Sequence, residues 1–260
     1  MKKYIEQKLF KKNKNLEKTN KTDKSAILIG LNYPGSYYSL QGCINDVKNG
    51  EEYLKNHGYK TKLLTDNEVS SSFDVLQALN ELKKDSSKTV FFHYSGHGTQ
   101  VTDTNGDEID GKDETIYSKN GHLITDDEII SLLATFPENK NVVLVFDCCH
   151  SGTIADLPYI ATLTKLGHRE EKVKKPVKAN VICISGCRDN QTSADISEGN
   201  TAYGALSSSF YDILKKNENK QITWRQLYKE LALEMNKKRY EQIPQLSVSD
   251  PKLLEQTIML

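Results

Sequence analysis

The sequence predicts an α/β fold with a mostly parallel central sheet and helices on both of its faces. Short apolar runs alternate with amphipathic segments at least four times along the chain, which is the pattern of repeated β-α-β units. The apolar runs are typical of parallel strands that are buried on both faces. Two of these runs end in glycine-bounded polar turns, and in parallel sheets binding sites form beyond such carboxyl ends.

The first half of the chain begins with a buried strand and continues with two predicted helix-strand units. Each helical segment carries apolar residues at a spacing of three or four positions, so that one face is apolar. The strands are expected at residues 25–31, 59–65 and 89–95, and the helices at residues 43–57 and 73–84.

The second half continues the alternation with interruptions. Thr125 and Glu128 form the signature of a capping box, so a helix is expected over residues 125–136. An acidic stretch at residues 101–114 and a basic stretch at about residues 157–178 are expected to be loops, the second of them mobile. Further strands are expected at residues 141–147 and 179–185, helices near residues 201–216 and 222–238, and an edge strand at residues 243–249.

The composition limits both the organisation and the class of function. The 260 residues carry 35 Lys and Arg against 35 Asp and Glu, and this neutral balance argues against nucleic acid as the main ligand. No apolar run approaches the ~20 residues that span a membrane, and the basic start lacks the apolar core of a signal peptide. Five cysteines imply no disulfide framework. We therefore expect a cytoplasmic protein with no membrane association, a flexible basic tail at residues 1–24 and a single domain at residues 25–260.

The two glycine-bounded turns, HYSGHG and DCCHSG, carry the residue types of a cysteine peptidase. Such an enzyme needs a thiolate, a histidine that moves the proton, and N–H donors for the oxyanion. His97 and Cys149 lie beyond the two strand ends and form the expected pair. His93 and His150 remain alternatives for the histidine, although His93 lies inside its strand and is expected to pack there.

These turns belong to a set of motifs that resembles the metacaspases, a family of caspase-like cysteine peptidases. The motifs are GLNYPG (30–35), LQGCINDV (40–47), FFHYSGHGTQ (91–100), FDCCHSG (146–152), DLPY (156–159) and ISGCRDNQTSAD (185–195). They follow one another in the family's order over roughly residues 25–250. The resemblance implies a caspase-like three-layer sandwich, a monomer, protein or peptide substrates, and a catalytic dyad of His97 and Cys149. Their separation of about fifty residues, histidine first, matches caspases, and Cys148 receives no catalytic role.

The resemblance also implies an oxyanion hole and a first specificity pocket. The backbone N–H groups of Gly98 and Cys149 are the expected oxyanion donors. The residues that the resemblance places around the pocket are Cys43, Asp46, Ser95 and Asp147. Carboxylates in the pocket predict cleavage after Arg or Lys, and not after Asp as in caspases. From the residues alone, Asp46 is equally well an exposed acid in the first turn of a helix.

Calcium is the expected activator. Residues 103–114 superficially resemble an EF-hand loop, but Glu108 stands where a glycine is needed and no helix precedes the loop, so this motif is rejected. The resemblance instead implies a site of dispersed carboxylates at Asp113, Asp126, Asp127 and Asp156. Hard cations prefer such oxygen ligands. The alternative interpretation is that Asp126 and Asp127 are merely the first-turn acids of a helix.

An enzyme that cleaves after basic residues meets several of them in its own basic loop, so autoprocessing of a zymogen is expected. The candidate sites in this loop are Lys165, Arg169, Lys172, Lys174 and Lys175, with Lys11 and Lys12 in the tail as rivals. The alternative is a solvated charged loop. The sequence lacks the motifs of cysteine phosphatases and P-loop enzymes, and its His and Cys pairs resemble no common zinc knuckle. The remaining rival function is a catalytically silent calcium-binding interaction module with the same fold.

Overall fold

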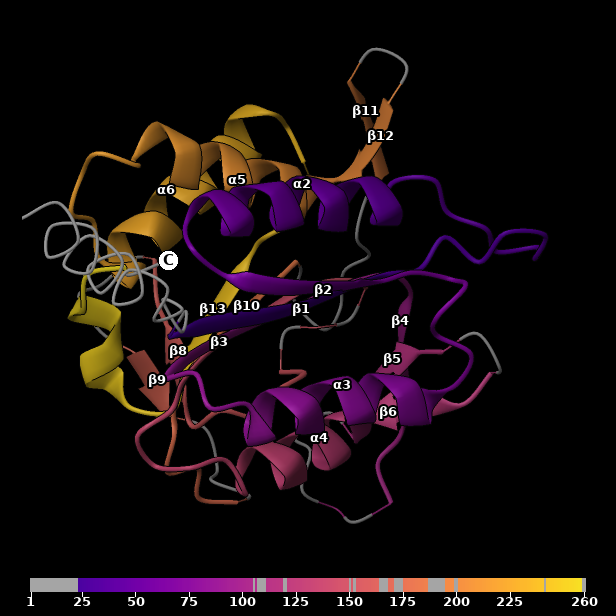
Figure 1. Ribbon diagram of the computed structural model, residues 1–260, viewed down its shortest axis with the longest axis horizontal. Helices are drawn as coiled ribbons and strands as arrows, with labels where there is room; N and C mark the ends of the chain where they lie inside the picture. The colour runs from indigo at the N-terminus through magenta and orange to yellow at the C-terminus, as the bar shows by residue number, and fades with distance from the viewer. Residues whose placement is uncertain are drawn as a thin grey trace, which may run out of the picture.

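A sheet of eight strands forms the centre of the molecule (Figure 1). The structure is a computed structural model that describes residues 23–104, 106, 111–118, 121–149, 151, 153–163, 168–170, 175–186, 195–198, 201–240 and 242–258. Within these residues the strand order is β2 (Lys60–Leu64), β1 (Lys24–Gly30), β3 (Thr89–Ser95), β7 (Asn141–Asp147), β10 (Asn180–Ser185), β13 (Gln245–Val248), β8 (Tyr159–Ala161) and β9 (His168–Glu170). The first five strands of this order are parallel neighbours, and each of the last three pairs antiparallel with the strand before it.

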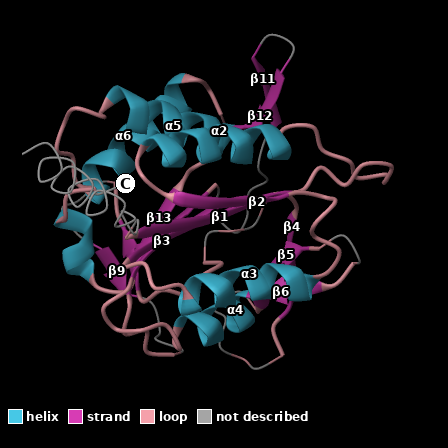
Figure 2. Cartoon of the chain, viewed as in Figure 1, coloured by secondary structure: helices cyan, strands magenta, loops and turns pink. Residues whose placement is uncertain are grey.

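Helices cover both faces of the sheet, as Figures 1 and 2 show. One face carries α2 (Cys43–Asn56), α5 (Ala205–Lys216) and α6 (Trp224–Lys237). The other face carries α3 (Ser72–Lys84) and α4 (Asp126–Leu133), and a 3-10 helix, η1 (Pro251–Glu255), follows β13. The three-layer α/β sandwich with a mostly parallel sheet is therefore confirmed.

Alternate side chains of β1 enter two separate hydrophobic cores. Ile27 and Ile29 pack with residues of α3 and α4, whereas Ala26 and Leu28 pack with residues of α2, α5 and α6. This alternation follows from the strand period of two. Burial of a Leu or Ile side chain stabilises the fold by about 1.5–3 kcal/mol. The two cores therefore hold the sheet firmly beneath its carboxyl edge.

Two small antiparallel sheets extend the fold beyond the central sheet. One consists of β4 (Gly98–Thr102), β5 (Lys112–Tyr117) and β6 (Leu123–Thr125), and the other of β11 (Asp195–Glu198) and β12 (Thr201–Gly204). The expectation that residues 101–114 form one long loop was wrong at both ends, because β4 and β5 pair across the described part of it. The signal was missed because neither strand is an apolar run. The helix expected near residue 201 begins at Ala205, after β12.

The segment around β13 differs from the prediction. An edge strand was expected at residues 243–249, but β13 lies inside the sheet between β10 and β8. The outer positions are taken by β8 and β9, which come from the stretch at about residues 157–178 that was expected to be a loop. Their shortness, three residues each, explains why no period is visible in the sequence.

The amino-terminal prediction falls mostly outside the described residues. Residues 1–22 of the expected basic tail are among those that the structure does not describe, and Lys24 opens β1. The part of the chain that the structure describes contains no helix long and apolar enough to cross a membrane.

Candidate active site

The register of the central strands brings the two predicted catalytic turns together. β3 and β7 are parallel neighbours, and Ser95 is paired with Asp147 at their carboxyl ends. The Gly96 N–H continues this pairing by donating to the Asp147 carbonyl oxygen at 3.2 Å. His97 and Cys149 each lie two residues beyond the paired Ser95 and Asp147, so both catalytic candidates leave the sheet at the same point.

The backbones of the two turns are in close contact. A Cβ atom placed on Gly98 would lie 2.2 Å from the Cys149 carbonyl oxygen and 3.1 Å from the Cys148 Sγ atom. Only glycine allows this approach, because any side chain would collide with the backbone of the Cys149 turn. Gly98 and Cys149, which the sequence nominates as oxyanion donors, are therefore neighbours in space.

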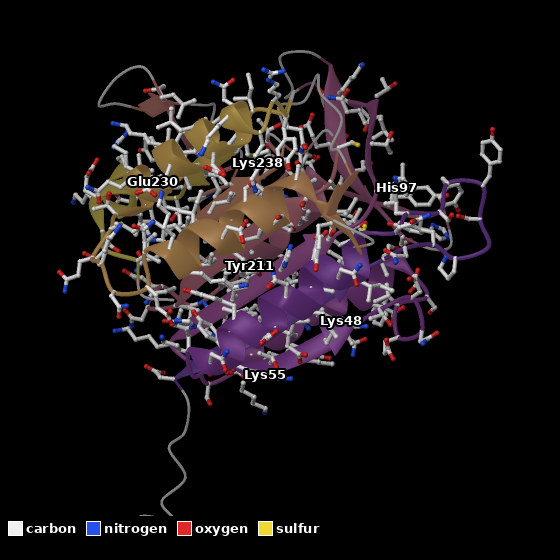
Figure 3. The ribbon with its side chains drawn as sticks, turned by 90° about the horizontal axis from the view of Figure 1, so that it is seen from above. Lys48, Lys55, His97, Tyr211, Glu230 and Lys238 are labelled. Atoms are coloured by element: carbon white, nitrogen blue, oxygen red, sulfur yellow. The ribbon has the colours of Figure 1, made fainter. Side chains whose placement is uncertain are left out.

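His97 is oriented through both its ring and its backbone. Its Nε2 atom lies 2.6 Å from the Tyr38 carbonyl oxygen. A carbonyl oxygen only accepts, so Nε2 carries a proton and Nδ1 holds the lone pair of the neutral ring. The His97 N–H donates to the Tyr33 hydroxyl at 3.1 Å, and the Tyr94 hydroxyl donates to the His97 carbonyl at 2.9 Å. Figure 3 shows His97 at the end of the molecule opposite Glu230.

The loop that carries Tyr33 is itself fixed. The Asp66 carboxylate accepts the N–H groups of Asn32 and Tyr33 at 2.9 and 2.8 Å. Tyr33 adopts a φ of 50°, a left-handed conformation that costs a residue with a side chain about 1 kcal/mol or more. Burial raises the pKa of Tyr33 and of Tyr94 well above the usual value, so both hydroxyls stay protonated and hold His97 as neutral dipoles.

The cysteines differ in exposure in a way that separates the predicted nucleophile from the rest. Among the described cysteines, Cys149 is the one that is partly exposed, whereas Cys43, Cys148 and Cys183 are buried. Burial raises the pKa of the Cys183 thiol to about 12, which leaves it unreactive at neutral pH. Cys148 packs in the core on the α3 side of the sheet. His150, the second alternative for the histidine, lies outside the described residues.

The predicted pocket residues assemble around two buried carboxylates. Ser95 Oγ donates to Asp46 Oδ2 at 2.7 Å, and the Gly204 N–H donates to Asp46 Oδ1 at 2.8 Å. The Ser207 N–H, in the first turn of α5, donates to Asp147 Oδ2 at 2.8 Å. Asp46 is only 1% exposed and Asp147 only 4% exposed, so Asp46 is not the exposed helix acid of the alternative interpretation.

Gly204 is where the two carboxylates meet. A Cβ atom on Gly204 would lie 2.2 Å from Asp147 Oδ2 and 2.8 Å from Asp46 Oδ2. Neither Gly204 nor Ser207 could be predicted from the sequence, because their contribution is a backbone N–H that every non-proline residue carries. Cys43, the fourth predicted pocket residue, opens α2 and is buried against Gly30.

Three of the four predicted calcium ligands converge. The ligand oxygens of Asp126, Asp127 and Asp156 all lie within 4.8 Å of one another. Oxygens that share one Ca²⁺ at about 2.4 Å cannot be more than about 4.8 Å apart, so this donor set fits a calcium ion. Asp113 is not part of this group and lies on the adjacent β5, where it is buried and paired with Val101.

Local structure explains how these acids are presented. Thr125 caps α4, and the predicted capping box is confirmed: Thr125 Oγ1 accepts the Glu128 N–H, and Glu128 accepts the Thr125 N–H. This cap fixes Asp126 and Asp127 in the first turn. Asp156 has a φ of 45°, a left-handed conformation in which aspartate is several-fold enriched, and this conformation is part of the loop geometry beside the first turn.

Comparison with known proteins agrees with this geometry. The caspase domain family matches residues 23–254. Metacaspase-1 of Ajellomyces capsulatus is 34% identical over 288 residues, which cover 88% of this chain and 80% of that protein. Metacaspase-1 of Scheffersomyces stipitis is also 34% identical, over 88% of this chain and 71% of that protein. The chain belongs to the metacaspase family.

Solved structures agree with the metacaspase fold. A protein from Geobacter sulfurreducens aligns with a TM-score of 0.67 and 28% identity, over 90% of this chain and 97% of that one. Caspase-1 from Spodoptera frugiperda aligns with a TM-score of 0.62 over 92% of each chain; at 13% identity, this likeness concerns the fold alone. As a metacaspase, the protein is a cysteine-type peptidase, and its substrates are proteins or peptides.

Proposed function

We propose that this metacaspase cleaves peptide bonds after Arg or Lys with a dyad of Cys149 and His97, and that calcium activates it. The observation that supports this proposal most directly is the pair of buried carboxylates, Asp147 at the end of β7 and Asp46 on α2, beside the strand ends from which the dyad leaves the sheet. The family resemblance further supports a monomer. The cytoplasmic location of the protein stays a prediction.

The dyad chemistry follows from the protonation pattern of His97. With Nε2–H held by the Tyr38 carbonyl, Nδ1 is the atom that takes the proton of Cys149. The thiolate attacks the scissile carbonyl carbon, and the negative oxygen is stabilised by the N–H groups of Gly98 and Cys149. The imidazolium then protonates the leaving amine, and neutral His97 activates water for deacylation. Each oxyanion donor is worth about 10²–10³ in rate.

The pocket chemistry favours a positive side chain. Ser95, Gly204 and Ser207 supply hydrogen bonds to Asp46 and Asp147, but none of these donors carries charge. Two nearby carboxylates repel each other unless a cation lies beside them, and a guanidinium or ammonium group supplies that charge with directional hydrogen bonds. An Asp side chain would add a third negative group and is therefore disfavoured.

Repulsion between neighbouring carboxylates also supports calcium binding at a second place in the molecule. Asp126, Asp127 and Asp156 would hold the ion, with Asp113 on the neighbouring strand as a further candidate. A bound Ca²⁺ would supply two positive charges, which offset most of the negative charge of the three carboxylates. In its absence the carboxylates repel one another, so the loop that carries Asp156, directly after the Cys149 turn, is less firmly held.

Autoprocessing in the basic stretch completes the proposal. Lys175 is followed by Pro176, which lacks the amide N–H of an ordinary scissile bond, so it is the weakest of the candidate sites. We expect cleavage at Lys165, Arg169, Lys172 or Lys174 in a calcium-treated sample. If the chain hydrolyses peptides but itself stays intact, the proposed autoprocessing is refuted and the proposed peptidase activity stands.

The deciding experiment uses fluorogenic peptides that end in Arg, Lys or Asp, with calcium or with a chelator. Calcium-dependent hydrolysis after Arg or Lys is expected, together with its loss in Cys149→Ala and its retention in the matched control Cys183→Ala. Hydrolysis after Asp would overturn the pocket assignment. Calcium binding without hydrolysis of any peptide by the folded protein would indicate the silent binding module instead.

A further inference from the structure

Glu114 is a buried acid that neither the dyad nor the pocket uses. It lies in β5 and is only 1% exposed. Its carboxylate accepts hydrogen bonds from Gln100 Nε2 at 3.0 Å and from Thr153 Oγ1. Its backbone N–H donates to Asp126 Oδ2 at 3.0 Å. A carboxylate is costly to bury, so a fixed set of donors is required to hold it in the core.

The partners of Glu114 come from three segments that matter for the proposed function. Gln100 lies in β4, three residues after His97, and Thr153 lies four residues after Cys149. The third contact, to Asp126, leads to the carboxylate cluster at the start of α4. One side chain and its own N–H therefore connect both catalytic turns with the cluster.

We propose that Glu114 is a positioning residue that couples the carboxylate cluster of Asp126, Asp127 and Asp156 to the spacing of the two catalytic turns. This inference rests on the proposed function. It adds a route by which the state of the cluster reaches the dyad, and it assigns no catalytic step to Glu114.

The route consists of contacts that the structure contains. Asp126 Oδ2 accepts the Glu114 N–H, so any change in the position of this carboxylate acts on β5 directly. Glu114 is paired in register with Gln100, so a shift of β5 reaches β4 and the turn before it. The hydroxyl of Thr153 takes the same shift to the turn that carries Cys149.

Coupling of this kind is reciprocal, which makes it measurable without following turnover. If calcium at the cluster favours the ordered dyad, it must tighten the binding of a ligand at the dyad. We define the coupling factor as the affinity for a peptide aldehyde ending in Arg in saturating calcium, divided by its affinity in chelator. Binding is measured by titration calorimetry on the full chain.

Thr153→Val is the sharpest variant, because it removes one hydroxyl at nearly constant volume and leaves every carboxylate in place. Thr153→Ser restores the hydroxyl. Thr115→Val is the matched control. Thr115 is a buried threonine of β5, next to Glu114, and its hydroxyl donates only to the Thr99 carbonyl at 2.9 Å. Gln100→Met tests the other arm and serves where Thr153→Val fails to fold.

We expect a parent coupling factor of about 5–150-fold, the usual range for coupled sites. Thr153→Val and Gln100→Met should lower it to less than a third of the parent value, while Thr153→Ser and Thr115→Val keep it. The affinity of the carboxylate cluster for calcium is measured in the Cys149→Ala background with and without Thr153→Val. The two affinities should agree within about threefold. A full coupling factor in both Thr153→Val and Gln100→Met, or an equal loss in Thr115→Val, would overturn the inference.

Measurements on the parent protein distinguish a failure of the proposed function from a failure of the coupling. If the parent binds neither calcium nor the aldehyde, the proposed function fails and the inference falls with it. If the parent binds both ligands but its coupling factor is one, the proposed site stands and the coupling through Glu114 is refuted.

Discussion

The Nε2 atom of His97 lies 2.6 Å from the carbonyl oxygen of Tyr38. This contact sets the tautomer of the histidine and would offer a partial negative charge to the imidazolium that forms in the proposed proton transfer. The third member of the arrangement is thus a backbone atom. Its chemistry is independent of the side chain at position 38, so the sequence contains no sign of it.

The side chain of Tyr33, unlike that of Tyr38, is expected to matter for rate. Tyr33→Phe removes the hydroxyl that accepts the His97 N–H and that also contacts Tyr94 and the Tyr117 carbonyl. An unsatisfied buried group costs about 1–3 kcal/mol, so kcat on an Arg peptide should fall about 5–150-fold with little change in KM. Tyr38→Phe, which keeps the carbonyl, is the control and should stay within about threefold. Equal losses in the two variants would contradict the assignment.

The pocket carboxylates are expected to control substrate choice. Removing one of them should not change the reactivity of the Cys149 thiol. Asp46→Asn removes one of the two buried charges while keeping the size of the side chain. We expect kcat/KM for an Arg peptide to fall about 10²-fold or more, because an Arg–carboxylate contact is lost. Alkylation of Cys149 by iodoacetamide should change less than about threefold. Asp212→Asn, at an exposed acid of α5, is the control.

A parallel fall in hydrolysis and in alkylation of the Asp46→Asn protein would mean that Asp46 supports the dyad itself. Unchanged discrimination between Arg and Asp peptides would remove Asp46 from the pocket altogether.

His93 should give the folded protein a measurable acid sensitivity. It is fully buried, its ring nitrogens face Ser207 Oγ at 3.0 Å and the Tyr211 hydroxyl at 3.1 Å, and burial lowers its pKa to about 3. In the unfolded chain it titrates near 6.5, so between these values the unfolded state binds more protons. The free energy of unfolding therefore keeps its full value with respect to His93 above about pH 6.5 and decreases as pH falls toward 3.

The measurement is urea unfolding between pH 4.5 and 6.5. His93→Gln should reduce the slope of the unfolding free energy with pH by about one proton, or about 1.4 kcal/mol per pH unit. His122→Gln, at an exposed histidine, should leave the slope unchanged. Identical slopes in the parent and in His93→Gln would show that His93 is not held neutral by burial.

The sequence was a good guide wherever a pattern is local. The helices at α2, α3 and α4 and the strands at β3 and β7 follow from apolar spacing, capping and glycine boundaries. The position of β13 could not be predicted, because a strand's own residues do not say which neighbours it has. β13 is an inner strand because β8 and β9 extend the sheet beyond it.

The candidate site shows the same division between side chains and backbone. His97, Cys149, Asp46 and Asp147 were predicted from residue type and motif. The strand register places His97, Cys149 and Asp147 at one edge of the sheet, and Asp46 reaches this edge from α2 through its hydrogen bond with Ser95. Gly204 and Ser207 act through N–H groups, which every non-proline residue carries. Glu114 was visible in the sequence only as the last position of the rejected EF-hand loop. Its actual contacts depend on the pairing of β4 with β5, which the sequence analysis did not predict.

Lys140 is expected to be a stability determinant far from the active site. Its ammonium group donates to the carbonyl oxygens of Leu82, Lys83 and Asp85 at 2.9, 3.0 and 2.6 Å, at the end of α3. These carbonyls lack partners within the helix, and a cation there also complements the helix dipole. Lys140→Met removes all three hydrogen bonds at once.

We expect Lys140→Met to lose about 2 kcal/mol of stability, which lowers Tm by about 4–8 °C in a chain of this size. Lys178→Met, at an exposed lysine, should change the stability by less than about 0.5 kcal/mol. Activity per folded molecule should be equal in both variants, because the end of α3 lies at the amino edge of the sheet, where Lys140 directly precedes β7. A Tm equal to that of the parent would mean that water replaces the ammonium group without cost.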